Sequence, residues 1–109
     1  MSMDFDALIA WLDGHVGQRV FAATQSASQD AGNTRLSVVG ALARAEGEIT
    51  LIDARPGRIE AFSVGDATLV LLEGDFLDAS PIDFGAGRPQ MVQAEFHGAV
   101  SVTVGEAPG

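Results

Sequence analysis

The first apolar residues of the chain recur with the period of an α-helix. Four of them fall at the spacing i, i+3, i+4 and i+7, on one helical face: Phe5, Leu8, Ile9 and Leu12. Asp4 is placed to cap the first turn, and Gly14 can end the helix. The pattern predicts a helix over about residues 4–13. Because so short a helix is marginal alone, its apolar face must pack against the rest of the chain.

After Gly17 the pattern changes to the alternation of apolar and polar residues that is typical of β-strands. We expect strands over the following segments: residues 18–25, 34–45, 49–54, 59–64, 67–73 and 91–104. Pro56-Gly57 fits the centre of a type II turn, and Gly65-Asp66 fits a two-residue hairpin loop. Residues 75–80 are expected to add a short extended piece or a helical turn, and residues 105–109 a frayed tail.

The last strand segment has apolar residues at even positions on both sides of Gly98. A two-residue turn there would put Phe96 on the opposite face from the valines that follow, so parity excludes it. Two arrangements are left: one long strand bent at Gly98, or a hairpin whose three-residue loop pairs Phe96 with Val100. We favour the bent strand, because glycine often marks tight curvature in small barrels, and we interpret Gly40 in the same way.

These elements predict a single domain over residues 1–109, as expected for a chain of 109 residues. The fold class is mainly β (α+β): an N-terminal helix plus a five- or six-stranded, strongly bent antiparallel sheet or small barrel.

The strand predicted over residues 67–73 is apolar on both faces. Leu69 and Leu71 lie on one face, and Val70 and Leu72 lie on the other. Such a strand is usually covered twice. The core would cover one face, and the N-terminal helix or a second subunit would cover the other. This strand is the clearest indication of a partner in the sequence.

The charge balance excludes several classes of partner and chemistry. Fifteen acidic residues stand against six arginines, a formal charge of −9, and cysteine is absent. The lack of cysteine excludes disulfides, thiolate catalysis and thiolate metal sites. The negative charge argues against nucleic acid or an anionic membrane as the main partner. Because no apolar window is long enough to span a bilayer and no secretory signal is apparent, we expect a soluble, cytoplasmic protein.

Two groups of charged residues are candidates for ligand binding. The acidic segment Glu73, Asp75, Asp78 and Asp83 offers the oxygen ligands that divalent cations prefer. Phe76 and Leu77 interrupt the ligand spacing, so a solvated acidic rim is the favoured interpretation. Arg55 and Arg58 flank a tight turn and could grip a carboxylate or phosphate, although solvated charges are again favoured.

The sequence contains no recognisable catalytic constellation. His15 and His97 are far apart in the chain, without a short-range pair of metal ligands. Neither a G-x-S-x-G nucleophile motif nor a phosphate-binding loop is present. We therefore expect no enzyme activity and no cofactor.

Over about residues 5–72 the chain resembles the Sm-like and SH3-like small β-barrels. The resemblance rests on an N-terminal helix followed by three short motifs: Gly17-x-x-Val20, Gly40-x-Leu42 and Phe62-Ser63-Val64-Gly65. Members of that family form rings that bind RNA through an aspartate–asparagine pair and an arginine–glycine loop. The resemblance implies the same activity only where this chain carries the matching residues. Glu46 and Thr50 stand at the positions of the pair, and Val64 replaces the arginine. The resemblance therefore implies the shape without the RNA-contacting residues.

The leading functional hypothesis is a non-catalytic module that binds another protein or assembles with itself, as a homodimer or higher oligomer. Trp11, Phe62 and Val70 are the binding candidates expected to be exposed near the outer face of strand 67–73. The alternative is a small-ligand or divalent-metal-binding protein that uses the acidic segment with Arg55 or Arg58. A third hypothesis is Sm-like RNA binding.

Overall fold

The computed structural model describes residues 2–28, 32–45, 57–82 and 90–107. These residues form one helix, seven strands and a single 3₁₀ turn: α1 (Phe5–Gly14), β1 (Arg19–Ser28), β2 (Gly32–Arg44), β3 (Ile59–Val64), β4 (Ala67–Leu72), η1 (Glu73–Asp75), β5 (Phe76–Ile82), β6 (Met91–Phe96) and β7 (Val100–Glu106). The mainly β fold class is confirmed, but the expected five or six strands are seven in the described part of the chain. The predicted strand 49–54 lies outside the described residues.

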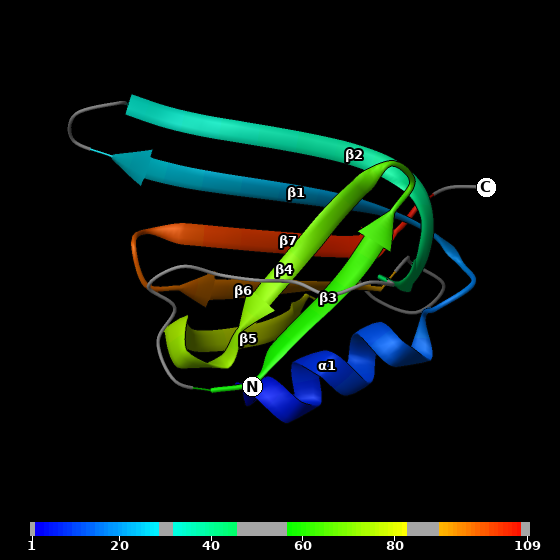
Figure 1. Ribbon diagram of the computed structural model, residues 1–109, viewed down its shortest axis with the longest axis horizontal. Helices are drawn as coiled ribbons and strands as arrows, with labels where there is room; N and C mark the ends of the chain where they lie inside the picture. The colour runs from blue at the N-terminus through cyan, green and yellow to red at the C-terminus, as the bar shows by residue number, and fades with distance from the viewer. Residues whose placement is uncertain (1, 29–31, 46–56, 83–89, 108–109) are drawn as a thin grey trace.

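The seven strands form one antiparallel sheet in the order β4-β3-β2-β1-β7-β6-β5. Within the described residues β4 and β5 do not pair with each other, so the sheet is open and the small barrel is not formed. Figure 1 shows the β3–β4 hairpin crossing diagonally in front of β1, β7 and β6. The sheet therefore folds over on itself, and the core lies inside the fold.

The favoured single bent strand over residues 91–104 is wrong, and the three-residue loop is confirmed. β6 and β7 form a hairpin in which Phe96 pairs with Val100. Gly98 and Ala99 both have positive φ, at 89° and 58°, and this left-handed backbone reverses the chain instead of curving it. β7 then continues to Glu106, which pairs with Val20 in β1. The expected frayed tail is therefore ordered as strand through Glu106.

Gly40 marks a close approach between two parts of the sheet. A Cβ atom on Gly40 would lie 2.6 Å from both the backbone N and the Cα of Gly65, in the β3–β4 turn. Gly65 also donates its N–H to the carbonyl of Ala41 at 3.3 Å. The missing side chain lets the hairpin turn rest directly on β2. The predicted two-residue turn is confirmed, because Val64 pairs with Ala67 across Gly65-Asp66.

Helix α1 begins at the predicted cap and bridges the two sides of the open sheet. Asp4 Oδ1 accepts the N–H of Ala7 at 2.7 Å. On one side, the Phe5 ring meets the Phe76 ring of β5 edge-on, with centroids 5.6 Å apart. On the other side, Asp13 forms an ion pair with Arg44 of β2 at 2.7 Å. The helix therefore spans the gap between β5 and the β2–β3 side of the sheet.

The buried core joins the apolar face of α1 to the inner face of the sheet. Its helix residues are the four predicted ones: Phe5, Leu8, Ile9 and Leu12. In β4, Leu69 and Leu71 are buried as expected, while Val70 is 37% exposed. The second face of β4 is thus only partly covered. No helix in the described residues is long and apolar enough to cross a membrane.

Candidate functional site: the outer edge of β4

An open sheet has two edges, and each edge strand presents backbone N–H and C=O groups that another strand could bind. Proteins usually protect such edges with charges, proline, bulges or a covering segment. The two end strands of this sheet, β4 and β5, differ in how far they are protected, and this difference locates the candidate site.

The β5 edge carries all four kinds of protection. Pro81 lies within the strand, Asp78 adds a charge, and a register shift between Phe76 and Asp78 forms a bulge. Met3 covers part of the edge, since its N–H donates to the carbonyl of Ala79 at 2.6 Å. This edge is poorly suited to a further strand.

The six residues of β4, ATLVLL, contain no charge, proline or bulge, and among the described strands only β3 pairs with them. The register with β3 shows which backbone groups β4 presents. Val64 and Ala67 flank a two-residue turn and therefore bond to each other, so Leu69 and Leu71 also bond towards β3. The alternate residues Thr68 and Val70 direct their N–H and C=O groups away from β3. We call this outward side of Ala67–Leu72 the β4 edge.

An apolar groove lies beside the β4 edge. Its volume is about 180 Å³, and it joins β4 to the β6–β7 hairpin. The residues that line it, which define the β4 groove, are Val70, Leu72, Asp75, Phe96, His97, Val100 and Val102. A cavity of roughly 150 Å³ holds a benzene ring, so the β4 groove has room for one leucine or phenylalanine side chain.

The apolar surface continues beyond the groove along the inner face of the sheet. Leu36 in β2 pairs with Thr24, and Thr24 pairs with Val102, so these three residues form one row across the sheet. Leu36 is 60% exposed although it lies on the face that is buried elsewhere in the sheet.

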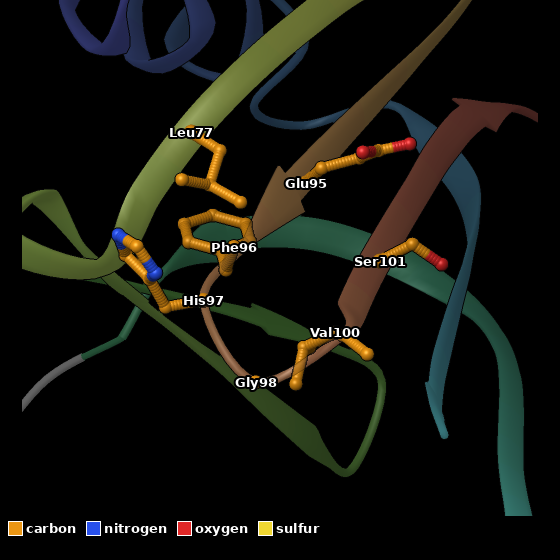
Figure 2. Close-up of a pocket in the computed structure, with 8 residues that line it drawn as sticks. Leu77, Glu95, Phe96, His97, Gly98, Val100 and Ser101 are labelled. Atoms are coloured by element: carbon orange, nitrogen blue, oxygen red, sulfur yellow. The ribbon is translucent and has the colours of Figure 1, made fainter. Parts of the chain in front are cut away.

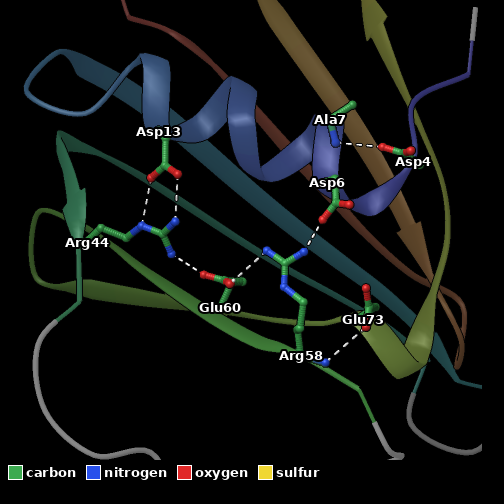
Figure 3. A network of polar contacts seen from close by, with 8 residues as sticks. All are labelled: Asp4, Asp6, Ala7, Asp13, Arg44, Arg58, Glu60 and Glu73. Carbon is green, nitrogen blue, oxygen red and sulfur yellow. Dashed lines mark hydrogen bonds and ion pairs between the residues drawn. The ribbon is translucent and has the colours of Figure 1, made fainter.

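A chain of ion pairs holds the other side of the β3–β4 hairpin to α1 (Figure 3). Arg44 binds Asp13 through Nε at 2.8 Å and Nη2 at 2.7 Å, and it also binds Glu60. Arg58 binds Glu60 at 3.1 Å and also contacts Asp6.

Glu60 lies at the centre of this chain. The hydrogen bond from Arg44, followed by that from Arg58, lowers the pKa of Glu60 below its ordinary value. The carboxylates of Asp13 and Glu60, which accept hydrogen bonds from Arg44, raise the pKa of Arg44. These ion pairs therefore join α1, β2 and β3, and none of them involves a residue of β4.

The structure separates the predicted binding residues. Phe62 is 0% exposed and belongs to the core, so its expected exposure is wrong: its strand position faces inward, beneath the guanidinium of Arg44. Trp11 is partly buried against the core and stacks on His15, with ring centroids 3.9 Å apart. Val70 lies at the candidate site. Arg58 is held by carboxylates, and Arg55 lies outside the described residues.

The acidic segment does not converge on a cation site in the part of the chain that the structure describes. No group of three or more potential metal ligands is found among the described residues. Glu73 accepts the backbone N–H of Arg58 at 3.2 Å, and Asp78 is exposed on β5. Asp75 accepts the backbone N–H of His97 through its carbonyl, at 2.7 Å. Asp83 lies outside the described residues.

A second hollow, of about 320 Å³, surrounds the β6–β7 turn and includes Glu95, His97 and Ser101. These residue types could form a nucleophile, a base and an orienting carboxylate only if their side chains converged. Figure 2 shows His97 on the opposite side of the Phe96 ring from Glu95 and Ser101. The three side chains therefore do not form a catalytic group.

The sequence pattern points to Val70 and to the doubly apolar strand, but not to the residues that complete the site. Thr68 contributes through its backbone, which no side-chain pattern reports. Phe96, Val100 and Val102 stand out only as apolar residues at even positions of the last strand segment. The absence of charge and proline from Ala67–Leu72 is the signal in the sequence that could have pointed to an unprotected edge.

Comparisons with known proteins do not assign the chain to a family: no family model, curated protein sequence or solved structure matches it.

Proposed function

We propose that this chain is a non-catalytic binding module that accepts an extended segment of another protein along the β4 edge. One observation carries the proposal: β5 has four kinds of edge protection, whereas β4 contains no charge, proline or bulge, has no described strand on its outer side and adjoins an apolar groove. Adding a strand to an exposed sheet edge is a common mode of peptide recognition.

The geometry supports a division of roles within the site. The backbone groups of Thr68 and Val70 would supply main-chain hydrogen bonds, each contributing about 1 kcal/mol net. The β4 groove would receive one apolar side chain, whose burial contributes about 2 kcal/mol. Because association has a substantial entropic cost, these terms lead us to expect weak binding, with a Kd of about 10 to 1,000 μM.

Charge makes a second copy of this chain a poor occupant of the edge. An antiparallel two-fold pairing centred on Leu69 or Val70 brings Asp66 of each copy within a residue of Glu73 of the other. Like charges facing each other across paired strands are destabilising. The net charge of −9 on each copy adds to this repulsion. These charges favour a segment of a different protein.

A selection from displayed random peptides tests the proposal. Peptides retained by the purified chain are expected to slow hydrogen exchange at the amides of Thr68 and Val70, because the added strand bonds to them. A lysine on an edge strand opposes pairing, so Val70→Lys is expected to weaken these peptides about tenfold.

Val39→Lys is the matched control, because Val39 is also an exposed strand valine, at 51%, and lies outside the β4 groove. It should change peptide affinity less than about twofold. Three results would overturn the proposal: no peptide retained, equal loss of binding in both variants, or a dimer in light scattering that Val70→Lys dissociates.

A further inference from the structure

We infer that the segment bound at the β4 edge has an apolar centre and arginine or lysine residues on both sides of it. This inference rests on the proposed function and specifies the chemistry of the partner. It follows from the distribution of charge around β4, which is uncharged along its length and acidic beyond both ends.

Asp66 lies at one end of β4, in the two-residue turn, and is exposed. Glu73 follows the other end directly and is also exposed. Among the described residues, Asp66 forms no ion pair with an arginine, and Glu73 accepts the backbone N–H of Arg58 at 3.2 Å. A strand bound along β4 would therefore extend past exposed carboxylates at both ends.

The described arginines of the ion-pair chain do not offset this charge. Arg44 is held by Asp13 and Glu60, and Arg58 is held by Asp6 and Glu60. These contacts direct both guanidinium groups towards α1 and β3 (Figure 3). The β4 edge thus combines an apolar centre with acidic ends, and charge complementarity favours a segment with the opposite charges in the same places.

Three synthetic peptides distinguish this inference from the proposed function. Each has about ten residues with a core of alternating valine and threonine, flanked on both sides by arginines, serines or glutamates. Isotope-labelled protein is titrated with each peptide, and binding is followed by the shifts of the Thr68 and Val70 amide signals. At low salt we expect the arginine peptide to bind about tenfold more tightly than the serine peptide, and the glutamate peptide most weakly.

Asp66→Asn tests the acidic end directly, and Glu95→Gln is its control. Both variants lose one negative charge, but Glu95 is exposed on the outer face of β6, away from the β4 edge. Asp66→Asn is expected to weaken the arginine peptide about threefold and leave the serine peptide unchanged. Glu95→Gln should leave both affinities unchanged, and circular dichroism confirms that each variant is folded.

The outcomes separate the two proposals. Equal affinity of the three peptides, with the Thr68 and Val70 amides still shifted, would overturn the inference about charge and leave the proposed function standing. Equal effects of Asp66→Asn and Glu95→Gln would also overturn the inference, since the attraction would then reflect net charge alone. If no peptide shifts the Thr68 and Val70 signals, both proposals fail.

Discussion

Replacing Gly40 with alanine tests how the β3–β4 hairpin is positioned over the sheet. The new Cβ would lie 2.6 Å from two backbone atoms of Gly65 and 3.3 Å from the carbonyl carbon of Val64. Ordinary van der Waals contact begins near 3.5 Å, so the hairpin must move by almost 1 Å. Backbone atoms cannot rotate aside as a flexible side chain can.

Overpacking of this kind lowers stability by about 1–3 kcal/mol. The lower entropy of the unfolded alanine variant offsets about 0.5 kcal/mol of this loss. We expect Gly40→Ala to lower the free energy of unfolding by about 2 kcal/mol. Urea denaturation followed by the fluorescence of the single tryptophan, Trp11, measures it.

Two other glycines provide a graded comparison. A Cβ on Gly105 would meet the Phe21 ring at 2.6 Å, and this half-buried side chain can shift, so Gly105→Ala should cost less than Gly40→Ala. Gly14 has nothing within 4 Å, and Gly14→Ala should stabilise the end of α1 by about 0.5 kcal/mol. The reasoning is refuted if Gly40→Ala unfolds within about 0.5 kcal/mol of the unmodified chain.

Three further predictions follow from single contacts. Asp4→Ala removes the cap of α1 and should lower the free energy of unfolding by about 1 kcal/mol. Asp4→Asn keeps a side-chain oxygen that can cap the helix and should retain most of this stability. An equal loss of stability in both variants in urea denaturation would contradict the cap. Because its arginine partners lower the pKa of Glu60, this carboxylate contributes stability above its ordinary pKa of 4.5, and that contribution is lost as the pH falls through the lowered value. Glu60→Gln should therefore lower the free energy of unfolding by about 1 kcal/mol at neutral pH, and it should reduce the fall of stability with pH on the acid side. Glu95→Gln should have neither effect. If urea denaturation gives parallel curves of stability against pH for Glu60→Gln and the unmodified chain, the ion-pair chain is contradicted. In the free protein the amide of Val70 should exchange with deuterium faster than that of Leu69, which bonds to β3, and equal protection in NMR exchange would show that the β4 edge is covered.

The elements that the sequence predicts well are those with strong local signals. The helix over residues 4–13 has both its apolar period and its cap, and α1 begins one residue later. The strand 59–64 and the Gly65-Asp66 turn are correct because a two-residue loop fixes the register of its hairpin. The last segment misled because a mid-strand glycine is compatible with either a bend or a reversal, and only the positive φ of Gly98 distinguishes them.

The candidate site was only partly predictable, because edges and grooves depend on which strands fail to pair. Apolar residues on both faces of the 67–73 strand indicated a partner, and Val70 does lie at the open edge. Phe62 was assigned to the exposed set, although alternation along β3 places it in the core. The pattern of a single strand shows that its two faces differ, but it does not show which face is turned to the core of the protein.

The sequence by itself determined an acidic composition without cysteine and three kinds of local conformation: a capped helix, alternating strands and a two-residue turn. These follow from backbone preferences and hydrophobic periodicity within a few neighbouring residues. Only the tertiary structure decided that the described strands form an open sheet, that Gly40 receives the hairpin turn and that β4 lies at an end of the strand order. Those features arise from contacts between residues far apart in the chain, and local sequence preferences do not encode the free energy of such contacts.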